Sequence, residues 1–113
     1  MSFLQRLGNK FFEDSLRERV IETLREIHDP EIPINIYDLG LIYGLDIDDM
    51  GRVDIRMTLP APGCPVAQTF PAQVEDAVEL VYGVSRATVE LVWDPPWDQS
   101  RLSEAARLQL GLV

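Results

Sequence analysis

Two runs of alternating hydrophobicity, separated by a tight turn, occupy the middle of the chain. Apolar residues recur with a period of two over 41–47 and again over 53–59. Because the side chains of a strand point alternately to its two faces, each run is typical of a half-buried β-strand. The residues between the runs, Asp48-Asp49-Met50-Gly51, are typical of a turn. The pattern predicts an antiparallel hairpin.

Patterns typical of helices lie on both sides of this hairpin. Upstream, Ser15-Leu16-Arg17-Glu18 has the spacing of a capping box, which predicts a helix that begins there and ends before Pro30. Downstream, apolar residues recur at helical spacing over 66–81 and predict a second helix with a glycine cap near Gly83. We expect a kink or an offset first turn at Pro71, because proline cannot donate a backbone hydrogen bond.

A third strand is predicted over 86–93, where apolar and polar residues alternate again. Since the second helix would form a long crossover, we expect the second and third strands to be parallel. A short capped helix is predicted from Ser103 to Leu110, closed by Gly111. We therefore predict an α+β fold: a small mixed three-stranded sheet with helices on one face, in the order helix, strand, strand, helix, strand, plus a short C-terminal helix.

The weak pattern at the start of the chain sets the predicted domain boundary. We assign residues 1–13 to an N-terminal arm and residues 14–113 to a single domain, because the chain contains no repeat or linker. A three-stranded sheet has two edges and one uncovered face, so we expect self-association as a homodimer.

The charge balance limits the classes of partner. The 113 residues include 10 Lys and Arg against 19 Asp and Glu, a formal net charge of −9. Nucleic acid and anionic membrane surfaces require a basic face, so we expect neither as a partner. No apolar run approaches the ~20 residues of a membrane span, and the first ten residues lack a secretory signal pattern. We expect a cytoplasmic protein.

Cys64, the only cysteine, lies between the second predicted strand and the second predicted helix. If Pro65 is the first helical residue, the sulfur lies at the positive end of the helix dipole, which favours a thiolate. The alternative is a small hydrophobic core residue, as most single cysteines are. One cysteine cannot form a disulfide or a four-cysteine metal site within one subunit. Any chemistry of Cys64 therefore requires a partner or acts through a single thiol.

Acidic residues are candidates to accompany the thiol. Carboxylates at Asp29, Glu31 and Asp38 would raise the pKa of Cys64, which fits transient metal handling better than nucleophilic catalysis. The alternative for these residues is structural, as solvated caps and turn formers. A thiol enzyme pairing Cys64 with His28 is a further alternative, although no oxyanion donors can be recognised by spacing.

The segment Trp93-Asp94-Pro95-Pro96-Trp97 is the last candidate. Its simplest interpretation is a rigid strap that packs two large rings on the core. The functional alternative is a partner-binding surface formed by Trp93, Asp94 and Trp97.

Four motifs, spread over about residues 15–112, occur in the same order as in a known family. In these motifs the chain resembles the SufT and PaaD type of small iron-sulfur assembly accessory proteins, which share a domain with eukaryotic cytosolic iron-sulfur targeting factors. The motifs are Asp29-Pro30-Glu31-Ile32-Pro33, Ile36-Tyr37-Asp38-Leu39-Gly40-Leu41-Ile42-Tyr43, Met57-Thr58-Leu59 through Pro62-Gly63-Cys64-Pro65, and Trp93 to Trp97 with Ser103-Glu104-Ala105-Ala106-Arg107-Leu108.

The resemblance implies an accessory factor, not an enzyme, that assists iron-sulfur cluster assembly or delivery within the SUF system. It implies a reactive cysteine at Cys64 and an acidic and hydroxyl cluster at Asp29, Glu31, Asp38 and Thr58. The expected partners are the SUF machinery and client apoproteins.

The only expected cofactor is a transient iron ion or iron-sulfur cluster. Cys64 would be its one ligand from this chain, and a second subunit or a partner would complete the set. Family members often carry a second threonine where this chain has Pro60, so one hydroxyl of the cluster is missing. The alternative function is a non-metal adaptor that binds client proteins through the strap and the acidic surface.

Overall fold

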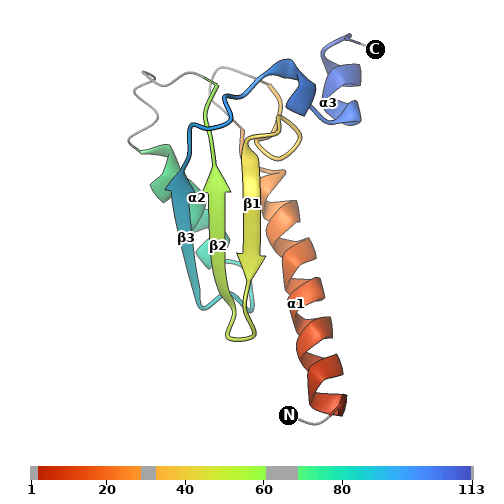
Figure 1. Ribbon diagram of the computed structural model, residues 1–113, viewed down its shortest axis with the longest axis vertical. Helices are drawn as coiled ribbons and strands as arrows, with labels where there is room; N and C mark the ends of the chain where they lie inside the picture. The colour runs from red at the N-terminus through yellow and green to blue at the C-terminus, as the bar shows by residue number, and fades with distance from the viewer. Residues whose placement is uncertain (1–2, 29–32, 61–68, 113) are drawn as a thin grey trace.

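The computed structural model describes residues 3–28, 33–60 and 69–112, with side chains from Phe11 onward. Its elements are α1 (Phe3–Leu24), β1 (Ile42–Ile47), β2 (Arg52–Met57), α2 (Phe70–Glu79), β3 (Arg86–Leu91), the 3-10 helix η2 (Gln99–Arg101) and α3 (Glu104–Gln109). The sheet order is β1-β2-β3, with β1 antiparallel and β3 parallel to β2. In Figure 1, α2 lies behind the sheet and α1 runs along its β1 side, and neither helix covers the face turned toward the viewer. The predicted α+β fold is confirmed.

Alternation along β2 determines which face of the sheet is buried. Val53, Ile55 and Met57 are at most 1% exposed, whereas the residues between them are exposed. The helices contribute matching apolar faces, so the core lies between the sheet and the two helices; the helical core residues are Leu16, Val20, Leu24, Phe70, Val74 and Val78. Fully burying one such side chain stabilises the fold by roughly 1.5–3 kcal/mol.

The predicted start of the first helix was wrong. Helix α1 begins at Phe3, so residues 3–13, which we assigned to an arm, are helical and continuous with the rest of α1. Ser15 is not an N-cap: it lies within the helix, and its Oγ accepts a hydrogen bond from Arg19 Nη1 at 2.8 Å. The N-terminal part of α1 nevertheless extends past the sheet (Figure 1).

The first helix also ends earlier than predicted, at Leu24 and not near Pro30. The backbone beyond it is held in another conformation: the N–H of Ile36 donates to the carbonyl of Ile27 at 2.8 Å, and His28 forms a β-bridge with Asn35. Because this bridge requires extended backbone, the helix cannot continue through residues 27 and 28.

The second and third helices test the proline and capping predictions. Helix α2 begins at Phe70 with Thr69 as its N-cap, and not near residue 66, so Cys64 is not at the N-terminus of α2. Pro71 lies in the first turn, where its missing N–H would have had no helical partner, so α2 has no kink there; an offset turn before it, the other expectation, falls outside the described residues. Helix α2 ends at Glu79, so Gly83, with a φ of +100°, belongs to the following turn and is not the cap. Helix α3 is confirmed: the Ser103 Oγ accepts a hydrogen bond from the N–H of Ala106 at 3.1 Å.

Both outer strands of the sheet are contacted by a charged side chain from a helix. Arg17 Nη1 donates to the carbonyl of Leu45 at 2.8 Å, and the N–H of Val89 donates to Glu75 Oε1 at 2.8 Å. Such contacts occupy edge groups that would otherwise be open to another strand. The homodimer stays a prediction, and these contacts disfavour edge-to-edge strand pairing as its interface. Within the described ranges, no helix is long and apolar enough to cross a membrane.

Candidate functional site

The candidate site lies at one end of the sheet, which we call the loop end. It comprises residues 33–41 before β1, residues 58–60 after β2 and residues 92–102 after β3. These three segments meet at the upper end of the sheet in Figure 1. Because β2 and β3 are parallel, both strands end there, and backbone pairing continues one step further: the N–H of Val92 donates to the carbonyl of Met57 at 2.8 Å.

Thr58 is the one buried polar side chain in the described core. It is 1% exposed, and its N–H donates to the carbonyl of Leu41 at 2.8 Å. Its Oγ1 is buried and has no hydrogen-bond partner among the residues that the structure describes. An unpaired buried hydroxyl costs about 1–3 kcal/mol. The position is therefore favourable for a ligand that offers a hydrogen-bond acceptor.

Asp38 organises the loop before β1. Its Oδ2 accepts a hydrogen bond from Asn35 Nδ2 at 2.8 Å, and its N–H donates to Asn35 Oδ1 at 2.8 Å. Its backbone carbonyl accepts from the N–H of Ser103 at 2.8 Å, which joins the loop to the start of α3. These contacts fit the turn-forming interpretation of Asp38.

The strap of residues 93–97 continues to Leu102, and we use the name strap from here on for residues 93–102. It crosses the loop before β1. Trp97 Nε1 donates to the carbonyl of Leu39 at 2.7 Å, across 58 residues of sequence, and the Tyr43 hydroxyl donates to the carbonyl of Pro95 at 2.8 Å. The Arg101 guanidinium lies over the Tyr43 ring, 4.3 Å from its centroid, in a cation–π contact. The strap is therefore attached to the loop at Leu39 and to β1 at Tyr43.

The crossing requires a glycine at position 40. Gly40 has a φ of +82°, a conformation that residues with a Cβ rarely adopt. A Cβ at this position would also collide with the backbone carbonyl of Arg101. At Gly40 the backbones of loop and strap are therefore so close that no side chain larger than the hydrogen of glycine fits between them.

The residues of the strap differ in exposure. The ring of Trp97 is half-buried and packs against the core, in agreement with the structural interpretation. Trp93 is 41% exposed and Asp94 is also exposed, so both are accessible to a partner. Hydrogen bonds from the Ser100 hydroxyl and N–H lower the pKa of Asp98, so this strap carboxylate is charged at neutral pH.

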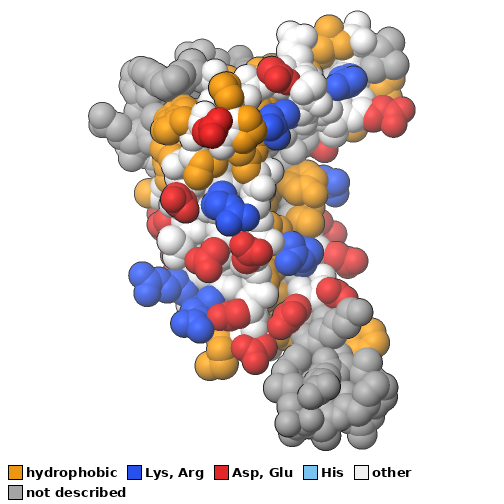
Figure 2. Space-filling view, in the orientation of Figure 1, with side chains coloured by type: hydrophobic (Ala, Val, Ile, Leu, Met, Phe, Trp, Pro, Cys, Tyr) orange, Lys and Arg blue, Asp and Glu red, His pale blue; other side chains and the backbone are white. Residues whose placement is uncertain are grey.

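Side-chain type changes along the open face of the sheet. Figure 2 shows acidic and basic side chains interspersed over the middle and lower sheet, with hydrophobic side chains gathered at its upper end. Two of the charged residues, Arg56 and Asp46, form an ion pair at 3.8 Å. The loop end is thus the more apolar part of this face, which suits protein contact more than solvation.

The structure brings Asp38, Thr58 and the strap tryptophans to the loop end. Three predicted site residues, Cys64, Asp29 and Glu31, lie outside the described residues. Within the described part of the chain, no group of three or more His, Cys, Asp or Glu side chains could hold a metal ion.

Sequence reasoning missed three residues that build the loop end: Asn35 and Arg101 within it, and Tyr43 in the adjoining part of β1. The Asn35–Asp38 pair had a local signal, since Asn and Asp three residues apart often close a turn. Tyr43 was expected to continue the alternation of β1, but the register shifts between Ile42 and Gly44, as at a β-bulge. Its contact with Arg101 joins distant segments and leaves no local pattern.

Known proteins resemble this chain in both sequence and structure. The sequence model of a family described as "Iron-sulfur cluster assembly protein" matches residues 17–91. A Porphyromonas gingivalis protein, "Fe-S protein maturation auxiliary factor", is 41% identical, with 95% of this chain and 100% of the relative covered. A Staphylococcus aureus protein, "Fe-S protein maturation auxiliary factor SufT", is 36% identical, with 74% and 96% covered. The crystal structure of a domain of unknown function from Bacillus anthracis has a TM-score of 0.79 and 31% identity, with 96% and 99% covered.

Proposed function

Because the chain belongs to the family of iron-sulfur cluster assembly proteins, we propose that it is an auxiliary factor in the maturation of iron-sulfur proteins. The family resemblance predicted from the four motifs is confirmed. In our proposal the protein works in the cytoplasm with the SUF machinery, assists assembly or delivery of clusters to client apoproteins, and has no turnover chemistry of its own. The names of its relatives support this role.

The observation that carries the proposal is the buried hydroxyl of Thr58, unpaired among the described residues. Strand β2 delivers Thr58 to the loop end, and Cys64 follows six residues later in the sequence. Cluster sulfides and thiolate sulfurs accept hydrogen bonds, and such bonds tune a cluster without adding a ligand. We assign Thr58 this donor role.

Cys64 is the proposed contact to the cargo. Its thiolate would bind a transiently held iron ion or the edge of a cluster, with Asp29 and Glu31 beside it. One thiolate is far from the four ligands that a cluster requires, so the second subunit of a homodimer or the client itself would complete the set. Incomplete ligation by this chain also favours release to a client.

A second candidate function, a non-metal adaptor, is favoured by one observation. Trp93 is 41% exposed beside the exposed Asp94, on the strap that crosses the loop end. Large exposed aromatic side chains are common anchors of protein interfaces. In this candidate function the strap captures clients and Cys64 is dispensable.

Anaerobic reconstitution with ferrous iron and sulfide tests the metal-handling proposal. We expect wild-type protein to bind iron with the visible absorption of sulfur-ligated iron, and we expect Cys64→Ser to lose both iron and absorption. Identical spectra and iron stoichiometry for the two proteins would overturn direct contact by Cys64. If Cys64→Ser also retains function in cells while Trp93→Ser abolishes client capture, the adaptor function replaces the proposal.

Two substitutions of Thr58 separate stability from function. Thr58→Val removes a hydroxyl without a described partner, so the unfolding free energy should stay the same or rise, while bound iron falls. Thr58→Ser keeps the hydroxyl and loses a buried methyl group, so we expect a loss of about 1 kcal/mol with iron binding retained. If Thr58→Val instead destabilises the protein and leaves iron binding intact, the donor role of Thr58 is wrong.

A further inference from the structure

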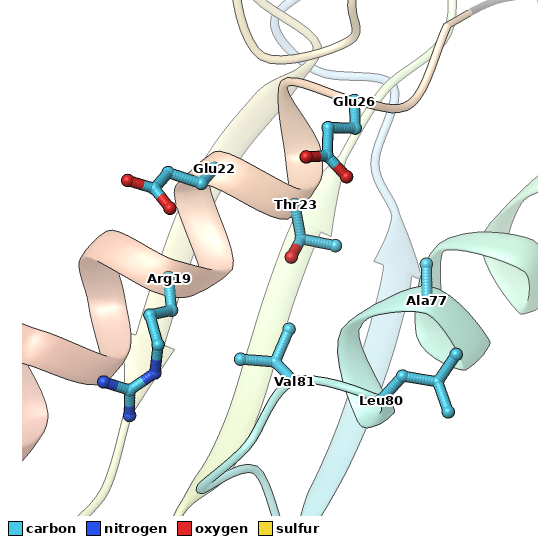
Figure 3. Close-up of a pocket in the computed structure, with 7 residues that line it drawn as sticks. All are labelled: Arg19, Glu22, Thr23, Glu26, Ala77, Leu80 and Val81. Carbon is cyan, nitrogen blue, oxygen red and sulfur yellow. The ribbon is translucent and has the colours of Figure 1, made fainter.

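Helices α1 and α2 enclose a groove on the side of the sheet that they cover. The groove has a volume of about 460 Å³ and is lined by Arg19, Glu22, Thr23, Glu26, Ala77, Leu80 and Val81. Figure 3 shows its two walls: the first four side chains come from α1 and the turn after it, and the last three from α2 and the turn after it. The loop end is formed by other segments, so the groove is separate from the candidate site.

The α2 wall is apolar, and one of its three side chains, Leu80, is highly exposed. Ala77, Leu80 and Val81 are spaced by three and four residues, so they share one face at the end of α2. Leu80 is 88% exposed, and the neighbouring Tyr82 is 89% exposed. Exposure of adjacent large apolar side chains is characteristic of interaction surfaces.

The apolar surface continues along α1 beyond the groove. A Cβ at Gly83 would lie 3.7 Å from the ring of Phe12, so Phe12 lies beside the turn that follows α2. Phe12 is 37% exposed and its neighbour Phe11 is 71% exposed. An elongated ligand lying along α1 would therefore meet apolar contacts over more than the groove itself.

The α1 wall is acidic. Glu22, near the end of α1, and Glu26, in the turn after it, are both exposed and form no ion pair with any described residue. The one cation among the lining residues, Arg19, forms no ion pair with these glutamates: its Nη1 donates to Ser15 Oγ at 2.8 Å and its Nη2 to the carbonyl of Tyr82 at 3.2 Å, both neutral acceptors. Like charges four residues apart repel one another, so a cation supplied from outside would be stabilised here.

We propose that this groove docks an amphipathic helix of a partner protein. The apolar face of that helix packs on Leu80 and Val81, and its Lys or Arg side chains pair with Glu22 and Glu26. A second copy of this chain is disfavoured as the occupant of this groove, because a two-fold interface there would bring the Glu22 and Glu26 carboxylates of both copies together. The inference goes beyond the proposed function and does not depend on Cys64.

A synthetic helix is a sufficient probe. We would use a fluorescein-labelled peptide of about 18 residues, long enough for appreciable helicity, with leucines on one helical face and lysines on the other. Fluorescence anisotropy should show binding that weakens as salt is added. A scrambled peptide of the same composition, whose leucines no longer share a face, should bind about tenfold more weakly.

Two matched pairs of charge-reversal substitutions test whether the peptide binds in the groove. Glu22→Lys with Glu26→Lys should weaken peptide binding about tenfold or more. The control pair, Asp54→Lys with Glu90→Lys, changes the net charge equally on the open face of the sheet and should alter binding less than about twofold. All four residues are exposed, so the fold should tolerate the changes, and thermal unfolding checks that it does.

A second matched pair tests the apolar wall. Leu80→Asp should weaken binding as strongly as the charge reversal, whereas Leu108→Asp, at a site 60% exposed on α3, should not. Cys64→Ser should bind the peptide like wild type, so failure of the proposed function and failure of this inference can be told apart.

Three outcomes would overturn the inference. If the scrambled peptide binds equally well, or if both charge-reversal pairs weaken binding equally, the acidic protein attracts cations without a docking site. If wild-type protein instead dimerises in a concentration-dependent way that Leu80→Asp abolishes, the occupant is a second copy of the chain and not a basic helix.

Discussion

The two ends of the sheet are held together in different ways. At the hairpin end, residues 48–52 and 82–85, Asp48 Oδ1 accepts from the N–H groups of Met50 and Arg52 at 2.9 Å, and Arg52 Nε donates to Asp48 Oδ2 at 2.7 Å. At the loop end, Trp97 and Tyr43 bond to carbonyls 58 and 52 residues away. The Asp48 side chain bonds only to neighbours in the sequence, although Ser85 also joins this turn through hydrogen bonds to the carbonyls of Met50 and Gly51 at 2.8 Å. At the loop end, side chains form the contacts between distant segments.

This contrast predicts which substitutions affect the candidate site as well as the stability of the fold. The Asp48 side chain bonds within its own turn and at an exposed position, so a change of that side chain should stay local. Each contact of the loop end positions two distant segments at once, so its loss should disturb the candidate site as well as stability. Four substitutions test the contrast, in decreasing order of expected effect.

Gly40→Ala should have the largest effect. The substitution places a Cβ against the carbonyl of Arg101 in a left-handed conformation, so we expect a loss of about 3 kcal/mol in unfolding free energy, measured by urea denaturation. Gly111→Ala is the control, since Gly111 has a φ of +75° with nothing within 4 Å of its Cβ position. It should cost only about 1 kcal/mol, and equal losses would show that the close approach of strap and loop contributes nothing.

Trp97→Phe should come next. The ring is largely kept, but the carbonyl of Leu39 loses its donor, which should cost about 1–2 kcal/mol by the same measurement. The control is Trp93→Phe, at the other end of the Trp-Asp-Pro-Pro-Trp segment, which should cost less than about 0.5 kcal/mol because Trp93 is 41% exposed. Similar effects of the two substitutions would contradict the attachment of the strap through Trp97.

Ser103→Ala should cost about 1 kcal/mol, because the N–H of Ala106 loses its cap at the start of α3. The loss is readily measured by thermal unfolding. Ser103→Thr keeps a capping hydroxyl and should retain most of the stability. If alanine and threonine behave alike, α3 does not depend on its cap.

Asp48→Asn should have the smallest effect, because its pair with Arg52 is exposed. Hydrogen bonds from Arg52 lower the pKa of Asp48, so the carboxylate stabilises the fold above its unfolded pKa of about 3.9 and loses this contribution as pH falls through the lowered value. The difference in Tm between wild type and Asp48→Asn should therefore be constant from pH 7 to pH 5 and vanish at more acidic pH. A difference that disappears already between pH 7 and pH 5 would assign the effect to another group.

Much of the fold could be predicted because its signals are local. The alternation of β2 and the turn after Asp48 are properties of adjacent residues, and both are found as expected. One local pattern gave a wrong prediction, that of the start of α1. The capping-box pattern at Ser15 predicts a helix start only if the preceding residues are not helical, and here they are.

The candidate site was less predictable, because its contacts join distant residues. The acidic residue Asp38 was recognised, but its role in closing a turn with Asn35 was decided by geometry. No local sequence pattern predicts the contact of Tyr43 with Arg101 or the close approach of the strap to Gly40. The positions of Cys64, Asp29 and Glu31 stay predictions.

The pairing of the strands also sets the order in which the molecule can form during synthesis. The turn between β1 and β2 is short, so the hairpin can close once Met57 has left the ribosome. Strand β3 must wait for the α2 crossover, and the strap is complete only near Leu102. The loop end is therefore among the last parts of the protein to exist, and a nascent chain that stops before the strap has a hairpin but no site.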